Sequence, residues 1–177
     1  MTRRLLALGL LLGALAGVAG ACGGSDASGP PSIEYGRDMC AECHMIISDE
    51  RFASAYRTSG GEVRIFDAPG DLVSQGLRKG ELDGAEVWVH DYGTRKWVDG
   101  SKATYVVGAD GVQSPMGWGV AAYAMAVDAR AFAGDSRGRV VAWKDLLGMA
   151  RSGDLKPGTG QGTGPTADGA GNLGGNE

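Results

Sequence analysis

The hydrophobic pattern of the central part of the chain changes twice from the period of a strand to the period of a helix. The first stretch predicts strands at 52–56 and 63–66, a helix that begins near Pro69 and stops at Gly80, and a strand at 86–90. Because consecutive elements of this kind pack a helix against a sheet, the pattern predicts an α+β fold.

A second stretch follows in a similar order. It predicts strands at 96–98 and 103–107, a helix from about Trp118 to Phe132, a strand at 139–143 and a last short helix at 145–150. We therefore expect two pseudo-repeated ββαβ units with antiparallel strands, at about 46–92 and 95–150. Met125 and Met149 fall on the helix patterns and are expected in the core.

The N-terminus has the pattern of an exported lipoprotein. Arg3 and Arg4 precede an apolar run at 5–18, which is too short to span a membrane and typical of a signal peptide. The run ends in Ala-Gly-Ala followed by Cys22, which resembles a bacterial lipobox. This predicts a signal peptide at 1–21 and a lipid-modified Cys22; the alternative is an ordinary secretory peptide with an incidental cysteine.

The residues on either side of the central region predict flexible ends. Residues 22–32 are small, polar and proline-containing, as in a flexible lipoprotein tether, and residues 154–177 form a Gly-rich tail that is expected to be disordered. This leaves 33–153 to fold. Gly23 stands where an Asp acts as an inner-membrane retention signal, so we expect a periplasm-facing protein on the outer membrane rather than the inner, or on the surface of a single-membrane bacterium.

Composition excludes several classes of function. The formal net charge is −4, so the chain has no basic field for nucleic acid. Three cysteines are too few for a disulfide framework. No side-chain pattern resembles a nucleophile with a positioned base, so we expect no enzyme activity.

The chemistry of the chain is concentrated at Cys40 and Cys43, which are the free thiols once Cys22 carries lipid. An oxidising compartment permits a local disulfide between them. Zinc requires four ligands, and no second cysteine pair exists. Thiolate and thioether ligands select Cu(I), and methionines flank the pair. A thioredoxin-like centre would need the pair at the point where a strand enters a helix, whereas this pair lies in a polar segment before the first predicted strand.

A further alternative is a c-type haem. The string Cys40-Ala41-Glu42-Cys43-His44 is that of covalent haem attachment, and Met116 is a candidate distal ligand. Small c-type domains are helical, however, whereas most of this chain is predicted to form strands.

The order of several motifs resembles the NosL family, the lipid-anchored copper accessory proteins linked to maturation of nitrous oxide reductase. The matching segments are DMCAECHMIISD (38–49), IFDAPGDL (65–72), VWVHDYGT (87–94), WVDG (97–100), ATYV (103–106) and SPMGWG (114–119).

The resemblance implies a Cu(I)-binding metallochaperone, with copper delivered to nitrous oxide reductase or its membrane maturation complex. It also implies paired ββαβ units. Cys40, Cys43 and Met45 match the family's Cys-x-x-Cys-x-Met segment, and Met116 matches its Pro-Met-Gly segment. His44 departs from the family, where a Gly is common, and remains a further candidate ligand.

Three hypotheses of different class follow. They are a copper metallochaperone, a c-type haem electron carrier, and a scaffolding lipoprotein in which Cys40 and Cys43 form a structural disulfide. Two other polar residues have structural interpretations: Asp67 is expected to cap a helix, and His90 to make a local hydrogen bond within a strand.

Overall fold

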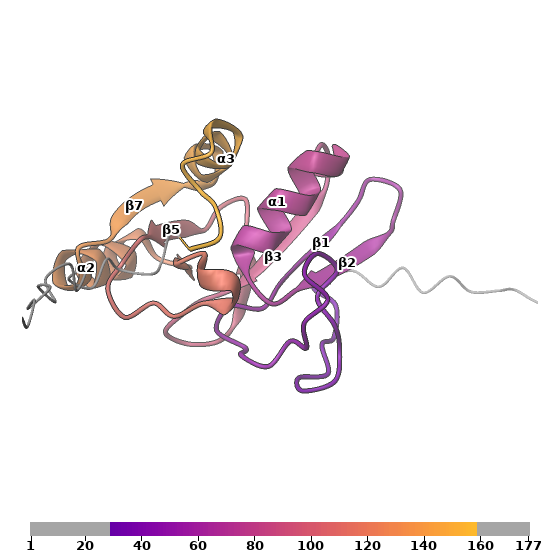
Figure 1. The fold of residues 1–177 in the computed structure, drawn as a ribbon, viewed down its shortest axis with the longest axis horizontal. Helices are drawn as coiled ribbons and strands as arrows, with labels where there is room; N and C mark the ends of the chain where they lie inside the picture. The colour runs from indigo at the N-terminus through magenta and orange to yellow at the C-terminus, as the bar shows by residue number, and fades with distance from the viewer. Residues whose placement is uncertain (1–28, 159–177) are drawn as a thin grey trace, which may run out of the picture.

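The computed structural model describes residues 29–158, which form two small sheets and three α-helices (Figure 1). The elements in chain order are β1 (Ser54–Arg57), β2 (Val63–Phe66), α1 (Pro69–Lys79), β3 (Glu86–His90), β4 (Trp97–Asp99), β5 (Thr104–Val107), the short 3-10 helix η1 (Pro115–Gly117), β6 (Val120–Tyr123), α2 (Ala126–Ser136), β7 (Arg139–Ala142) and α3 (Trp143–Ser152). No helix among these is long and apolar enough to span a membrane. The predicted signal peptide, Cys22 and residues 159–177 lie outside the described residues.

The first sheet has the strand order β2-β1-β3-β4, and all its neighbouring strands are antiparallel. Strands β1 and β2 form a hairpin that pairs Ser54 with Phe66, so both predicted strands are present. Helix α1 begins with Pro69 at its first turn and ends at Gly80, whose φ of 68° is the left-handed conformation that glycine adopts at a helix C-terminus. The first unit is thus the predicted ββαβ.

The second sheet has the order β6-β5-β7 and is also antiparallel. With α2 between β6 and β7, the order β5, β6, α2, β7 is again ββαβ. The α+β class with two repeated units is therefore confirmed. Strand β4, which the sequence pattern placed in the second unit, pairs with β3 in the first sheet instead.

The predicted helix from Trp118 to Phe132 is wrong in its first half. Residues 120–123 form β6, and all four are buried. A short apolar run that is buried on both faces shows no period of two, so its pattern does not distinguish a strand from a buried helix. Pairing with β5 decides the outcome, and the helix begins only at Ala126.

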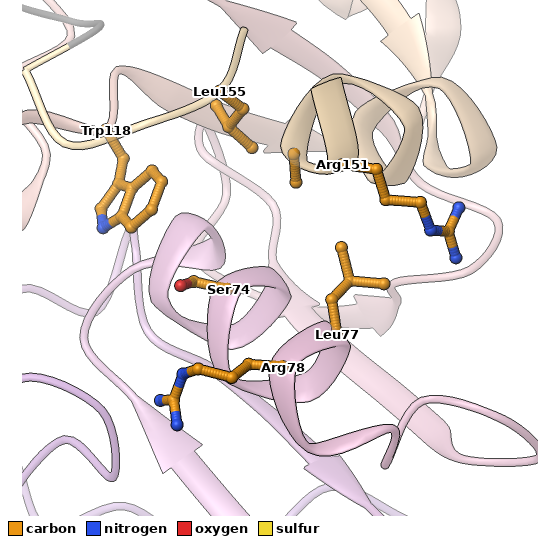
Figure 2. A pocket seen from close by; sticks show the side chains of 7 residues that line it. Ser74, Leu77, Arg78, Trp118, Arg151 and Leu155 are labelled. Carbon is orange, nitrogen blue, oxygen red and sulfur yellow. The ribbon is translucent and has the colours of Figure 1, made fainter. Parts of the chain in front are cut away.

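Helices α1 and α3 lie side by side and border an open pocket of about 300 Å³. Its lining residues are Ser74, Leu77, Arg78, Trp118, Ala150, Arg151 and Leu155. Figure 2 shows the guanidinium groups of Arg78 and Arg151 turned away from Leu77 and Leu155 at its centre. Both charges therefore lie at the outer edge of the pocket.

Candidate metal centre

The two thiols lie on a loop of residues 38–47, here called the cysteine loop, which precedes β1. The loop folds back on itself: the Cys40 N–H donates to Met45 O at 2.8 Å, and the Ile47 N–H donates to Asp38 O at 2.8 Å. Inside this turn the Cys43 N–H points at the Cys40 Sγ, 3.5 Å away. The close spacing in sequence therefore becomes close spacing of the two sulfur atoms.

His44 closes the turn in a left-handed conformation, with φ of 60°. Its N–H donates to Cys40 O at 3.1 Å, so the turn needs this backbone geometry. Residues with a Cβ adopt this conformation at an energetic cost, whereas glycine adopts it without that cost. This gives a physical reason for the glycine that the family resemblance leads us to expect at this place.

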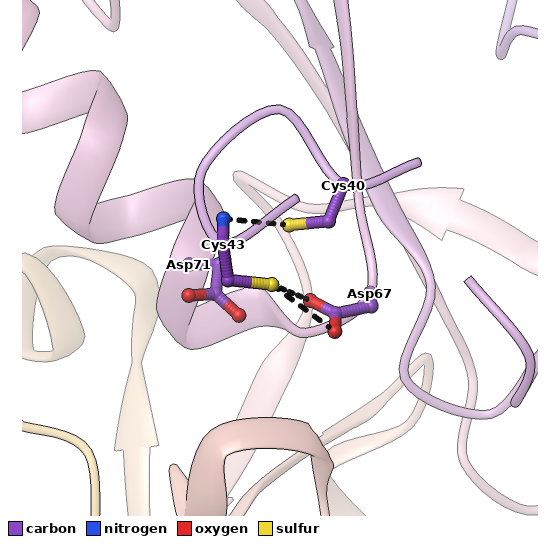
Figure 3. Close-up of side chains that lie close together, drawn as sticks. All are labelled: Cys40, Cys43, Asp67 and Asp71. Carbon is purple, nitrogen blue, oxygen red and sulfur yellow. Dashed lines mark hydrogen bonds between the residues drawn. The ribbon is translucent and has the colours of Figure 1, made fainter. Parts of the chain in front are cut away.

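Two carboxylates join the thiols in one buried group (Figure 3). One donor atom each from Cys40, Cys43, Asp67 and Asp71 lies within 4.8 Å of the other three. We call these four residues the thiol–carboxylate cluster. The Cys43 Sγ donates to both oxygens of Asp67, at 3.5 and 3.4 Å. Cys40 is 1% exposed, and Cys43 lies on the more open side.

Asp67 therefore has a different role from the helix cap expected from sequence. The N-cap of α1 is Ala68, and no side chain caps the helix there. The sequence also led us to expect too few ligands for zinc. This is wrong, because Asp67 and Asp71 supply two oxygen donors beside the two sulfurs, which makes four. The sequence places both carboxylates in the segment IFDAPGDL (65–72), but it does not show that they lie beside the thiols, which are 24 to 31 residues away along the chain.

Burial sets the protonation of the cluster. It raises the pKa of the Cys40 thiol, against the opposing effect of the Cys43 and Asp67 backbone N–H groups. Burial also raises the pKa of Cys43, and the charge of Asp67 adds to that rise. Burial and then the neighbouring Asp67 raise the pKa of Asp71. Four acidic groups this close do not all ionise without a cation, so an incoming metal must displace protons.

Trp118 forms one wall of this region, directly after η1. The indole packs on Gly70 so closely that a Cβ at Gly70 would stand 2.1 Å from the ring. The Trp118 indole opposes the rise in the pKa of Asp71, although neither Asp71 Oδ2 nor Trp118 Nε1 makes a hydrogen bond of ordinary geometry with a described residue. In Figure 1 η1 lies beside the first turn of α1, so its residues reach the end of the helix that carries Asp71.

The two candidate methionine ligands are exposed. Met45, on the cysteine loop, and Met116, in η1, are each 42% exposed. Neither side chain is therefore buried in the core. Met116 has φ of 54°, a left-handed conformation in the middle of the turn.

The two histidines are not part of the thiol–carboxylate cluster. His44 is exposed at the end of the turn. His90 is buried, with its Nδ1 2.9 Å from Ala53 O and its ring against Trp97 at 3.7 Å between centroids, which agrees with the structural role expected from sequence.

Comparison with known proteins places the chain in one family. The NosL family model matches residues 33–149. The copper-binding lipoprotein NosL of Stutzerimonas stutzeri is 29% identical over 125 residues, which cover 66% of this chain and 65% of that protein. The crystal structure of the copper chaperone NosL from Shewanella denitrificans shares the fold, with a TM-score of 0.58 at 22% identity over 66% of this chain and 94% of the other.

Proposed function

The chain belongs to the NosL family, and we propose that it is a copper-binding metallochaperone, which holds one Cu(I) ion and passes it on without catalytic turnover. The observation that carries this proposal is the pair of free thiols at Cys40 and Cys43, held together in one turn beside an exposed methionine. Thiolates and thioethers are the ligands that select Cu(I).

We propose Cys40 and Cys43 as the principal ligands, with Met45 and Met116 as thioether ligands. Cu(I) is satisfied by two or three soft ligands, so the thiols and one methionine suffice. Both methionines expose their sulfur-bearing side chains, Met45 on the cysteine loop two residues after Cys43 and Met116 on η1. A methionine ligand carries no proton, so it adds affinity without adding pH dependence.

The recipient of the copper is proposed from the family resemblance. We expect nitrous oxide reductase, or the membrane complex that matures it, to receive the ion. We also expect the mature protein to begin at lipid-modified Cys22 and to face the periplasm from the outer membrane, or the cell surface in a single-membrane bacterium. Intact-mass analysis of the membrane fraction should find the acyl chains on Cys22, and a soluble mature chain with a free Cys22 would refute the anchor.

The haem alternative meets a structural obstacle. Covalent attachment requires both cysteine sulfurs to reach the macrocycle, but Cys40 is 1% exposed within the core. Its sulfur faces Cys43 and the two carboxylates rather than an open crevice.

A competition titration of the reduced protein against a Cu(I) chelator tests the proposed function. We expect about one equivalent of Cu(I) to bind, in preference to Zn(II), because the proposed methionine thioethers are soft ligands that suit Cu(I) rather than zinc. Because burial keeps both thiols protonated, binding must release their protons, so affinity should fall as pH falls, by up to about tenfold per pH unit for each thiol that ionises.

Variants of the ligands separate their roles. Cys40→Ser or Cys43→Ser should weaken binding by orders of magnitude, while Met45→Leu or Met116→Leu should weaken it less and keep the pH slope. If the double cysteine variant bound Cu(I) as tightly as the parent, the pair would be structural and the proposal wrong.

A further inference from the structure

The two residues between the cysteines are attached to helix α1 by a set of side-chain contacts. We propose that Glu42 and Gln75 are positioning residues, which hold the cysteine loop in the conformation that presents Cys40 and Cys43 to a metal. This inference rests on the proposed copper function, and neither residue is itself a ligand in it.

Glu42 carries a carboxylate that points at α1 rather than at the cluster. Its Oε1 accepts from the Ser74 hydroxyl at 3.4 Å, and its Oε2 accepts from Gln75 Nε2 at 3.1 Å. The Arg78 guanidinium also binds Oε2, which explains why it turns away from the pocket in Figure 2. Three residues from two adjacent turns of α1 therefore hold one side chain of the loop.

Gln75 fixes the backbone of the same loop. Its Nε2 donates to Ala41 O at 2.6 Å as well as to Glu42, so both of its amide hydrogens are used on the residues between the cysteines. Its Oε1 lies 3.4 Å from the Tyr56 hydroxyl, whose one proton goes to the nearer Glu81 carboxylate. Gln75 and Tyr56 are both buried, so this packing contact connects the loop to the core of the first unit.

These contacts act on the geometry of the metal site. Gln75 and Asp71 lie one turn apart on α1, so the helix that supplies a carboxylate to the cluster also fixes the distance of the loop from it. Preorganised ligands bind a metal more tightly because less conformational freedom is lost on binding. Loosening the loop should therefore weaken copper binding, mainly through faster release.

The Arg78 contact should matter least. Its side chain is 59% exposed, and exposed ion pairs contribute little because water screens them. Ser74 and Gln75 donate to different oxygens of Glu42. A glutamine at that position can accept from Gln75 with its one oxygen and donate its amide to the Ser74 hydroxyl, which can also accept, so it keeps both contacts and loses the charge.

The experiment compares Cu(I) affinity and the rate of copper transfer to a chelator among four variants. Glu42→Ala and Gln75→Leu should each weaken affinity about tenfold and speed release by a similar factor. The double variant should lose no more copper affinity than the more affected of the two single variants, because both changes remove the same attachment. Glu42→Gln should stay within about threefold of wild type.

Glu86→Ala is the matched control. It removes the ion pair of Glu86 with Arg57 on strands β3 and β1, and should leave copper affinity unchanged. Amide hydrogen exchange of the metal-free protein should show faster exchange at Cys40 and Cys43 in Glu42→Ala than in the control, which reports loop order without copper.

The outcomes separate the two proposals. Wild-type affinity and release in both Glu42→Ala and Gln75→Leu would overturn the positioning role, and so would losses that multiply in the double variant. If wild type itself failed to bind Cu(I), the proposed function would be wrong, and unchanged exchange in Glu42→Ala would then also refute the positioning of the loop.

Discussion

His44 occupies a backbone position that suits glycine, and this one residue also creates the haem-like string. A left-handed φ costs a residue with a Cβ about 1 kcal/mol. A glycine avoids this cost, but it makes the unfolded chain more flexible, and this cancels part of the gain in stability. We predict that His44→Gly raises the stability of the metal-free protein by somewhat less than about 1 kcal/mol. Thermal unfolding should show a melting temperature higher by a few degrees.

Ser59→Gly is the control for this prediction, because Ser59 is exposed in a turn and is not among the residues with positive φ. That change should lower stability. Cu(I) affinity of His44→Gly should equal that of wild type, since His44 lies outside the thiol–carboxylate cluster. A large loss of affinity would instead identify His44 as a ligand.

The site could be predicted only in part from sequence, for a reason visible in its residues. Cys40 and Cys43 were recognised because two intervening residues bring their sulfur atoms together locally. Asp67 and Asp71 reach the cluster only through the packing of α1 against the cysteine loop, and Glu42 meets Gln75 in the same way. Nothing local to any of these four residues specifies that contact.

At the scale of elements, α1 and β6 show when the sequence pattern is sufficient to predict a helix or strand and when it is not. Helix α1 has a proline at its start, a glycine at its end and one apolar face, so its limits follow from sequence. Strand β6 lies in an Ala-rich apolar run with no alternation, and its pairing with β5 determines its structure. The same error explains why Met125 was wrongly expected in the core: it lies at the N-cap of α2 and is 59% exposed. Met149 on α3 is buried, as predicted.

At the scale of the molecule, one carboxylate joins the two repeated units. Asp91 follows β3 in the first unit, and its Oδ2 accepts from the Ala124 N–H of the second unit at 2.8 Å. Its Oδ1 accepts from the N–H and the hydroxyl of Thr94, both at 2.8 Å. Beside it the Tyr92 N–H donates to Ala122 O. Asp91 lies in the segment VWVHDYGT (87–94), which resembles the family, and these contacts give it a structural role rather than a metal-binding one.

Burial alone would raise the pKa of Asp91, but the N–H groups of Ala124 and Thr94 and the Thr94 hydroxyl outweigh it and hold the pKa below its usual range. The charged form is therefore favoured by folding. Its contribution is present above the unfolded pKa of about 4 and is lost as pH falls through the lower folded value.

We predict that Asp91→Ala lowers the free energy of unfolding by about 3 kcal/mol at neutral pH, because two backbone N–H groups lose a charged acceptor in a buried place. Denaturant titrations at neutral pH and near pH 3 measure the effect, and the gap between variant and wild type should narrow in acid. Asp135→Asn, an exposed carboxylate on α2, is the control and should change little at either pH. A cost below about 1 kcal/mol for Asp91→Ala would mean that the apolar contacts between the units hold them together without this residue.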